Sequence, residues 1–130
     1  MMVADTDVLI DFLAGCDPAA GRVALELGRG RLCTTAVTRF ELLGGARTTR
    51  QENAIRQLLT ALPALPLDQE AADRAAQVRV DLERAGQAIG MADSLIAGIV
   101  LARSGVLLTR NRRHFDRVPG LQLADLPALP

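Results

Sequence analysis

The chain has 130 residues, enough for one domain with a core of its own. Apolar residues make up 49% of it but aromatic residues only 2%, with no Trp or Tyr, so the core must be built from Ala, Leu, Val and Ile. The formal net charge is zero, so overall charge argues neither for nor against a nucleic-acid partner.

Two cysteines are too few for a disulfide scaffold. Cys16 and Cys33 both have apolar neighbours, and we interpret both as small core residues in a reducing compartment. No segment reaches the roughly 18 consecutive apolar residues of a membrane span. The first residues lack the basic region of an export signal. The sequence therefore predicts a cytoplasmic protein.

Short apolar runs alternate with longer amphipathic ones along the chain. The runs that read as strands are residues 2–5, 31–34, 62–67, 106–109 and 121–123. The segments with helical spacing are 6–14, 18–28, 36–46, 50–62, 69–84 after the cap Asp68, and 91–103, with a short turn at 111–116. Strands separated by helices imply a parallel sheet with right-handed crossovers. We therefore expect an α/β fold, a three-layer α/β/α sandwich of four to five parallel strands forming one domain over 1–130.

Acidic and basic residues are unevenly distributed. Residues 1–17 contain four aspartates and no basic residue, whereas 103–117 contain five arginines and one acid, Asp116. Every basic residue of the chain is an arginine, and its planar guanidinium offers paired donors to phosphate. The segment 1–17 is thus acidic, and the segment 103–117 is basic.

Several of these polar residues are expected at one edge of the sheet. Asp5 ends the first strand, Glu41 lies on the helix after the second, and Asp93 lies in the first turn of the apolar helix at 91–103. Asn111 and Asp116 follow the fourth strand. Ligands of open parallel sheets bind beyond the carboxyl ends of the strands, and a strand order of 3-2-1-4-5 would place the switch point between these loops. The sequence thus predicts an acidic cleft.

Carboxylates placed this close together repel one another, and some would keep their protons at neutral pH. A hard divalent cation such as Mg²⁺ or Mn²⁺ removes that penalty, because it prefers oxygen ligands. An acidic metal cluster with arginines around it points to phosphodiester chemistry.

Each of the first three aspartates also has a purely structural interpretation. Asp5 could simply end a strand, and Asp7 could be an acid favoured by the helix dipole. Asp11, four residues after Asp7, is expected on the solvent side of the helix.

The remaining polar residues have structural alternatives too. The spacing from Thr38 to Glu41 fits a capping box, although Thr35 is an equally good cap and would place Glu41 further inside the helix. Asp93 is conspicuous because the helix around it is nearly all apolar. His114, the only histidine, is expected to pack or to contact phosphate rather than to bind metal.

Four segments together resemble a known family. VADTDVLIDFL, TTAVTRFELLGGA, GMADSLIAGIVLARSG and LLTRNRRHFDRVPGLQL are similar to the signature blocks of PIN-domain ribonucleases. Their order, their spacing and the chain length resemble the VapC toxins of type II toxin–antitoxin modules. The resemblance extends over essentially the whole chain.

The resemblance assigns roles to individual residues. Asp5, Glu41 and Asp93 match the family's first three acids, which are catalytic and bind the metal. Thr6 and Thr109 match hydroxyl residues that support the site.

The fourth acid and the residue after the first Asp-Thr pair depart from the family pattern. Asp7 stands where many members have Asn or Ser. Asn111 stands where a fourth acid often falls, and Asp116 is a candidate catalytic residue that would replace it. The residues expected to contact RNA are Arg110, Arg112, Arg113 and His114.

The family implies a Mg²⁺- or Mn²⁺-dependent endoribonuclease that leaves a 5′-phosphate and a 3′-hydroxyl on structured RNA such as tRNA or rRNA. It also implies a homodimer and a VapB-like antitoxin that places a basic side chain near the acidic cleft. Apolar residues on helices 18–28 and 50–62 are expected to receive the antitoxin. The resemblance implies no membrane partner.

Other protein classes fit less well. The pair Asp5 and Asp7 also resembles haloacid-dehalogenase phosphatases, but those enzymes and response-regulator receivers need a lysine, and this chain has none. No G-x-G-x-x-G follows the first strand, which excludes a dinucleotide fingerprint. An alternative interpretation is a PIN-fold module that binds RNA or a partner without cleaving RNA. Asn111, at the position of the fourth acid, is the residue that indicates it.

Overall fold

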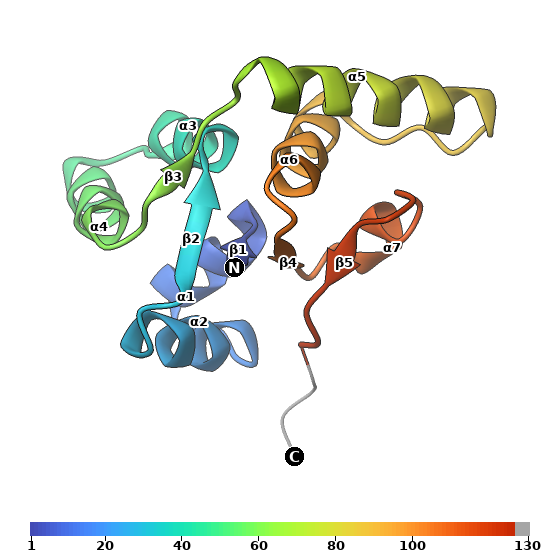
Figure 1. Cartoon of the computed structure of the whole chain (residues 1–130). Coiled ribbons are helices and arrows are strands. Elements are labelled where there is room, and N and C mark those ends of the chain that lie inside the picture. Colours follow the sequence, from blue (N-terminus) through green and yellow to red (C-terminus); the bar gives the residue numbers. More distant parts are fainter. Residues whose placement is uncertain (127–130) are drawn as a thin grey trace.

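Five short strands make one parallel sheet in the computed structural model, which describes residues 1–126. They are β1 (Met2–Ala4), β2 (Leu32–Thr35), β3 (Ala64–Leu65), β4 (Val106–Leu108) and β5 (Gln122–Leu123). Their order across the sheet is β3-β2-β1-β4-β5, so β1 pairs with β2 on one side and with β4 on the other (Figure 1). This confirms the predicted order and places the switch point between β1 and β4.

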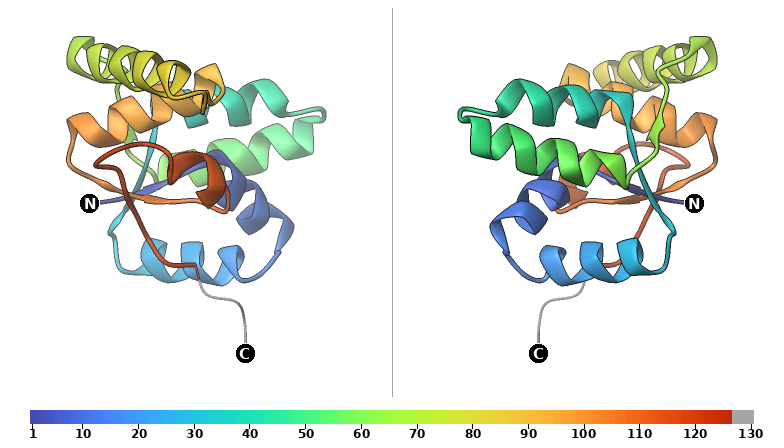
Figure 2. Two further views of the ribbon diagram at one scale, coloured as in Figure 1. Left: turned by 90° about the vertical axis from the view of Figure 1, so that its right-hand side faces the viewer. Right: turned by 90° about the vertical axis from the view of Figure 1, so that its left-hand side faces the viewer.

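Helices cover both faces of the sheet, which confirms the three-layer sandwich. They are α1 (Thr6–Ala14), α2 (Ala19–Gly28), α3 (Ala36–Gly45), α4 (Thr49–Thr60), α5 (Gln69–Arg84), α6 (Met91–Ala102) and α7 (Arg112–Phe115). The layers are visible in the two side views (Figure 2). One core cluster includes buried residues of α1, α2 and α4, and the other includes buried residues of α5, α6 and α7.

The strands supply both cores because successive side chains of a strand point to opposite faces. Val3 packs in the cluster beneath α5 and α6, and its neighbour Ala4 packs in the cluster beneath α1 and α2. In β4, Leu107 packs in the same cluster as Val3, and Leu108 packs in the same cluster as Ala4. All four residues are fully buried. A sheet covered on both faces therefore needs the continuous apolar runs seen in the sequence.

Helices α5 and α6 pack unusually closely. A Cβ atom added at Gly98 of α6 would lie 2.6 Å from the Ala71 oxygen and 2.6 Å from the Ala75 Cβ on α5. Only a residue without a side chain fits at that distance. This contact fixes the position of α6, which carries Asp93 in its first turn.

The predicted boundaries agree with the structure to within one or two residues for most elements. Asp68 caps α5 by accepting a hydrogen bond from the Ala71 N–H at 2.9 Å, as expected. The segment expected as a strand over 62–67 pairs only at Ala64–Leu65. Pro63 and Pro66 lack the N–H groups that a longer ladder would need.

One expectation about the cysteines is wrong. Cys33 is buried on β2, but Cys16 is exposed in the turn between α1 and α2. Gly15 ends α1 with φ 71°, and this turn carries the chain out of the core just before Cys16. Within residues 1–126, no helix is long and apolar enough to cross a membrane.

Candidate active site at the carboxyl edge of the sheet

Asp5 is the centre of the candidate site. It follows β1 directly and caps α1, with Oδ1 accepting a hydrogen bond from the Thr6 N–H at 2.8 Å. Its other oxygen, Oδ2, accepts a hydrogen bond from the Thr109 hydroxyl at 2.7 Å. Thr109 follows β4, which pairs with β1, so the sheet itself brings the two residues together. Asp5 is only 5% exposed.

The surroundings of Asp5 oppose its ionisation. Burial, first, and then the charge of Asp7 raise the pKa of Asp5 to about 7, with a smaller contribution from Asp93. The hydrogen bonds from Thr109 and from the Thr6 N–H act in the opposite direction but do not prevail. A carboxyl group held in this way is only partly ionised near neutral pH, and a cation beside it would favour the carboxylate form.

Asp7 lies beside Asp5 in the first turn of α1. Its Oδ2 accepts a hydrogen bond from the Arg110 N–H at 3.0 Å, and the Thr109 hydroxyl lies 3.3 Å away. Burial raises the pKa of Asp7, although the Arg110 N–H and guanidinium oppose this rise. Its Oδ1 is buried and has no hydrogen-bond partner. Asp7 therefore lies against the same Thr109 hydroxyl as Asp5.

Glu41 joins the site through a hydroxyl group. The Thr6 hydroxyl donates to Glu41 Oε1 at 2.7 Å and lies 3.0 Å from the Thr38 hydroxyl. Thr35 is the residue that caps α3, because its Oγ1 accepts from the Thr38 N–H at 3.0 Å. Glu41 therefore lies inside the helix and is not part of a capping box, and the open choice between the two caps is settled for Thr35.

Asp93 approaches the loop after β4 from α6. Its Oδ2 lies 3.4 Å from the Asn111 Nδ2, which donates to it, and 3.4 Å from the His114 Nδ1. Asn111 Nδ2 and His114 Nδ1 are 2.9 Å apart, and the tautomer of the imidazole decides which of its contacts is a donor. Asn111 therefore acts as a hydrogen-bond donor to Asp93.

Asp11 differs from the expectation of a solvent-facing residue. Its Oδ2 lies 2.5 Å from the Arg110 Nε, and its side chain is only 17% exposed. Residues four apart on a helix share a face, so Asp11 lies on the same face of α1 as Asp7, toward the loop that follows β4. The spacing of four residues from Asp7 is the sequence signal for this shared face.

The other predicted site residues lie in varied positions. The Arg112 guanidinium donates to the Ala124 carbonyl at 2.7 Å and so holds the end of β5. Arg113 and Asp116 are exposed. Among residues 1–126, no hydrogen bond or ion pair links the Asp116 side chain to the acids, so its role as a fourth acid stays a prediction.

The donors at this edge suit a hard divalent cation. Carboxylate oxygens are the ligands that Mg²⁺ and Mn²⁺ prefer, and the unpaired, buried Asp7 Oδ1 and the raised pKa of Asp5 are both relieved by a positive charge. Within the described residues, no three Asp, Glu, His or Cys side chains converge closely enough to form a metal centre by themselves. Asp5 and Asp7 both lie against the Thr109 hydroxyl, and Asp93 and Glu41 as ligands stay predictions.

A comparison with known protein families matches the PIN domain over residues 2–121. The tRNA(fMet)-specific endonuclease VapC of Shigella flexneri is 33% identical over 125 residues, which are 93% of this chain and 94% of that protein. The chain belongs to the PIN-domain family, among the VapC ribonucleases. Ribonuclease VapC10 of Mycobacterium tuberculosis is 32% identical and covers 88% of the chain and 86% of its own length.

A solved structure of this VapC group has the same fold. A chain of the DNA-bound VapBC complex from Salmonella typhimurium superposes with a TM-score of 0.85 and 28% sequence identity, covering 97% of this chain and 98% of its own. The family resemblance read from the four sequence blocks is thereby confirmed.

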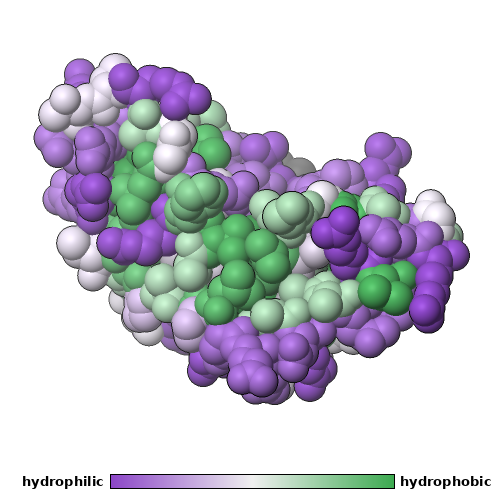
Figure 3. All heavy atoms as spheres, turned by 90° about the horizontal axis from the view of Figure 1, so that it is seen from above, coloured by the Kyte–Doolittle hydropathy of each residue, from purple (hydrophilic) through white to green (hydrophobic). Residues whose placement is uncertain are grey.

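Two hollows of this VapC protein lie next to Glu41. One, of about 480 Å³, is formed by α1, α3 and α4, and its apolar lining includes Ile10, Leu13 and Ile55. The other, of about 350 Å³, is lined by Phe40 and Met91 among others. Seen from above, apolar residues gather in the middle of the molecular face (Figure 3). Phe40 is 75% exposed and Met91 69%.

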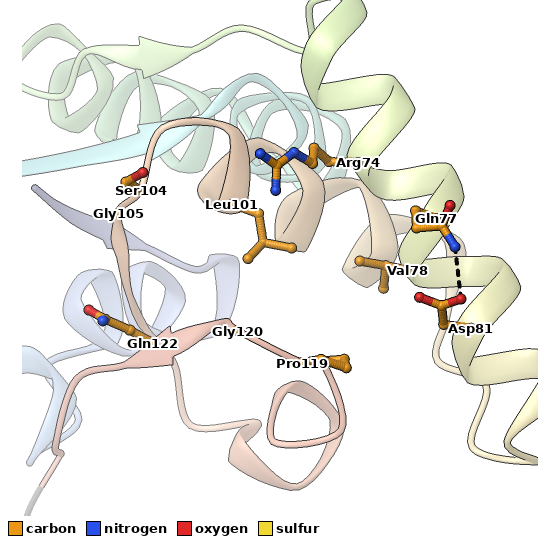
Figure 4. Close-up of a pocket in the computed structure, with 10 residues that line it drawn as sticks. All are labelled: Arg74, Gln77, Val78, Asp81, Leu101, Ser104, Gly105, Pro119, Gly120 and Gln122. Carbon is orange, nitrogen blue, oxygen red and sulfur yellow. Dashed lines mark hydrogen bonds between the residues drawn. The ribbon is translucent and has the colours of Figure 1, made fainter.

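A third hollow, of about 440 Å³, lies between α5, the turn before β4 and the loop before β5 (Figure 4). Its one carboxylate, Asp81, accepts a hydrogen bond from the Gln77 side chain at 2.8 Å. The acids of the candidate site are not among its lining residues. We therefore exclude it as the place of the carboxylate chemistry.

Proposed function

We propose that this chain is the toxin of a type II toxin–antitoxin module and acts as a Mg²⁺- or Mn²⁺-dependent endoribonuclease on structured RNA, tRNA or rRNA. The observation that carries the proposal is the pair of aspartates at the switch point, Asp5 buried and Asp7 half-buried, which share the Thr109 hydroxyl and of which Asp5 has its pKa raised to about 7. Membership of the VapC ribonucleases supports RNA as the substrate. Cytoplasmic location follows from that substrate and stays a prediction.

A divalent cation bound by these carboxylates would lower the pKa of water and neutralise charge on the phosphodiester. Asp5 and Asp7 would hold it, with Asp93 and Glu41 as further ligands. Thr109 orients the Asp5 carboxylate, and Thr6 orients the Glu41 carboxylate. These hydroxyls cost little reorganisation during the reaction because each is already fixed by a hydrogen bond.

Arg113 and His114 are the best placed to hold the RNA backbone. Arg113 is exposed and precedes His114 in the short helix α7, and the His114 side chain is 42% exposed beside Asp93. With no Trp or Tyr in the chain, base stacking falls to Arg, His114 or Phe.

We also propose a homodimer and a VapB-like antitoxin as partners. The similar Salmonella typhimurium chain comes from a VapBC complex, which supports a partner of this kind. The hollow between α1, α3 and α4 suits an apolar antitoxin segment, and Glu41 at its border places such a segment near the acids. The sequence predicts that helices 18–28 and 50–62 receive the antitoxin. Residues of α4 line this hollow, but no residue of α2 does.

The experiment uses the purified chain, freed of antitoxin, with total tRNA and rRNA in Mg²⁺ or Mn²⁺. We expect a few discrete fragments with 5′-phosphate ends, which disappear in excess EDTA and with the Asp93→Asn variant. Asp73→Asn, an exposed aspartate on α5, is the matched control and should cleave like the wild type. Equal cleavage by Asp93→Asn and the wild type would contradict the mechanism.

One observation favours a second candidate function, a PIN-fold module that binds RNA without cleaving it. Asn111 replaces an acid with a neutral amide, and its Nδ2 is directed to Asp93. Such a module would retain RNA binding in EDTA and release no fragments. The same assay, read by gel shift, separates the two functions.

A further inference from the structure

The loop that follows β4 ties three acids together. We call residues 109–111 the acid strap. The Thr109 hydroxyl donates to Asp5 at 2.7 Å, and the Asn111 side chain donates to Asp93 at 3.4 Å. The Thr109 oxygen also accepts the Asn111 N–H at 2.9 Å, which stiffens the strap. The position of this segment thus sets the geometry of acids that come from α1 and α6.

Arg110, in the middle of the strap, contacts α1 twice. Its backbone N–H donates to Asp7 Oδ2 at 3.0 Å, and its Nε lies 2.5 Å from Asp11 Oδ2, one helical turn further on. The guanidinium is therefore paired with α1, although the sequence suggested that it would contact RNA. The Asp11 carboxylate is 17% exposed and the Arg110 side chain 51%, so the pair is partly shielded from water.

We propose that the Asp11–Arg110 ion pair is a positioning device for the proposed ribonuclease site, on which this inference rests. The pair fixes the acid strap against α1. It thereby holds the Arg110 N–H on Asp7, the Thr109 hydroxyl on Asp5 and the Asn111 amide near Asp93. Neither partner of the pair touches the substrate in this role.

Two other roles for these residues make different predictions. If the pair acted only through its charges, removing Asp11 would weaken the binding of a cation, and removing Arg110 would strengthen it, because the two charges have opposite sign. If Arg110 bound an RNA phosphate, its removal would raise KM for RNA, and removing Asp11 would not weaken metal binding. A positioning role predicts that both removals weaken metal binding.

The test compares Asp11→Asn, Arg110→Gln and the exchanged pair Asp11→Arg with Arg110→Asp. The control variants are Glu83→Gln and Arg79→Gln, which break an exposed ion pair of 3.0 Å on α5. Mn²⁺ affinity is measured by calorimetry, and amide hydrogen exchange of Arg110 is measured by NMR in the absence of metal. Circular dichroism confirms that each variant folds.

We expect each single site variant to bind Mn²⁺ about tenfold more weakly, the size typical for residues that orient metal ligands. The Arg110 amide should exchange faster in Asp11→Asn, and the exchanged pair should recover affinity and protection. The α5 variants should behave like the wild type.

Affinity changes of opposite sign with unchanged amide exchange would overturn the proposal in favour of a simple charge effect. A raised KM in Arg110→Gln alone, with normal Mn²⁺ binding, would overturn it in favour of a phosphate contact. If the wild type itself binds no Mn²⁺ and cleaves no RNA, the proposed function fails, and the exchange measurement decides the inference separately. Unchanged exchange in Asp11→Asn then overturns the positioning role, and faster exchange supports it.

Discussion

Thr109 donates its hydroxyl to Asp5 at 2.7 Å, although the two residues are 104 positions apart in the sequence. Each residue directly follows a strand, and those strands, β4 and β1, are neighbours in the sheet. Thr109 is fully buried and its oxygen also accepts the Asn111 N–H. One hydroxyl group therefore connects the first acid to the segment that reaches Asp93.

Replacing Thr109 with valine tests this connection. Thr109→Val has nearly the same shape but removes the donor to Asp5 and the acceptor for the Asn111 N–H. We expect the cleavage rate to fall by about 10- to 100-fold, as is typical when a residue orienting a metal ligand is lost. Thr49→Val, at an exposed position on α4, is the control for the same chemical change. A rate equal to that of the wild type would show that Asp5 needs no such support.

Stability should depend on pH through Asp5. Because its pKa is near 7 in the folded chain and 3.8 when unfolded, the folded state binds more protons between these values. The free energy of unfolding, without divalent cations, should therefore fall as pH rises from about 4 to about 7. The loss from this one group is at most about 4 kcal/mol, from 1.36 kcal/mol for each pKa unit.

Urea unfolding in EDTA at pH 5 and pH 8 measures this effect. Asp5→Asn should remove most of the pH dependence and make the metal-free protein more stable at pH 8. The surface variant Asp73→Asn should keep the wild-type slope. If Asp5→Asn also keeps the wild-type slope, a group other than Asp5 causes the pH dependence of the free energy of unfolding.

The close contact of α5 and α6 predicts a large difference between two glycine substitutions. Gly98→Ala places a methyl group against Ala71 and Ala75 and should cost about 1–3 kcal/mol of unfolding free energy, like other cases of overpacking. Gly28→Ala, at the end of α2, has no atom within 4 Å of the added Cβ. It should gain about 0.5–1 kcal/mol, because alanine is the better helix former. Equal effects in chemical denaturation would contradict the observed packing.

The proposal that the hollow between α1, α3 and α4 is a groove for the antitoxin is tested at Ile10, which lines it and is 51% exposed on α1. Ile10→Asp should weaken capture of the proposed VapB-like antitoxin, since an apolar segment would then bury a charge. Val80→Asp, at an exposed apolar position on α5, should bind the antitoxin as the wild type does. Pull-down of the co-expressed antitoxin measures the difference. If both variants lose the antitoxin equally, the groove is not its specific site.

The order of the elements and the sheet topology could be predicted because local signals agree along this chain. Gly15 ends α1, Asp68 caps α5 and apolar runs mark the strands, so each boundary has its own chemical reason. The length of β3 was predicted less well than the other strands, because pairing depends on a neighbouring strand as well as on the run itself. Pro63 and Pro66 were the available sign for β3.

Asp5 could be located from its place after a strand, and Glu41 and Asp93 from their places on helices, but the partners of the arginines could not be predicted. Arg110 and Arg112 look alike in the sequence, yet one pairs with Asp11 and the other donates to the Ala124 carbonyl. Such choices depend on which surface each side chain meets after folding. The exposure of Cys16 was missed for the same reason, since its apolar neighbours in sequence are not its neighbours in space.

The central claim is that the acids at the carboxyl edge of the sheet hold a divalent cation. Anomalous diffraction from crystals soaked in Mn²⁺ at pH 8 tests it most directly, because the metal itself is located. We predict a peak within bonding distance of the Asp5 or Asp7 carboxylate, on the side facing Asp93. A peak elsewhere, or none at millimolar Mn²⁺, would contradict the account.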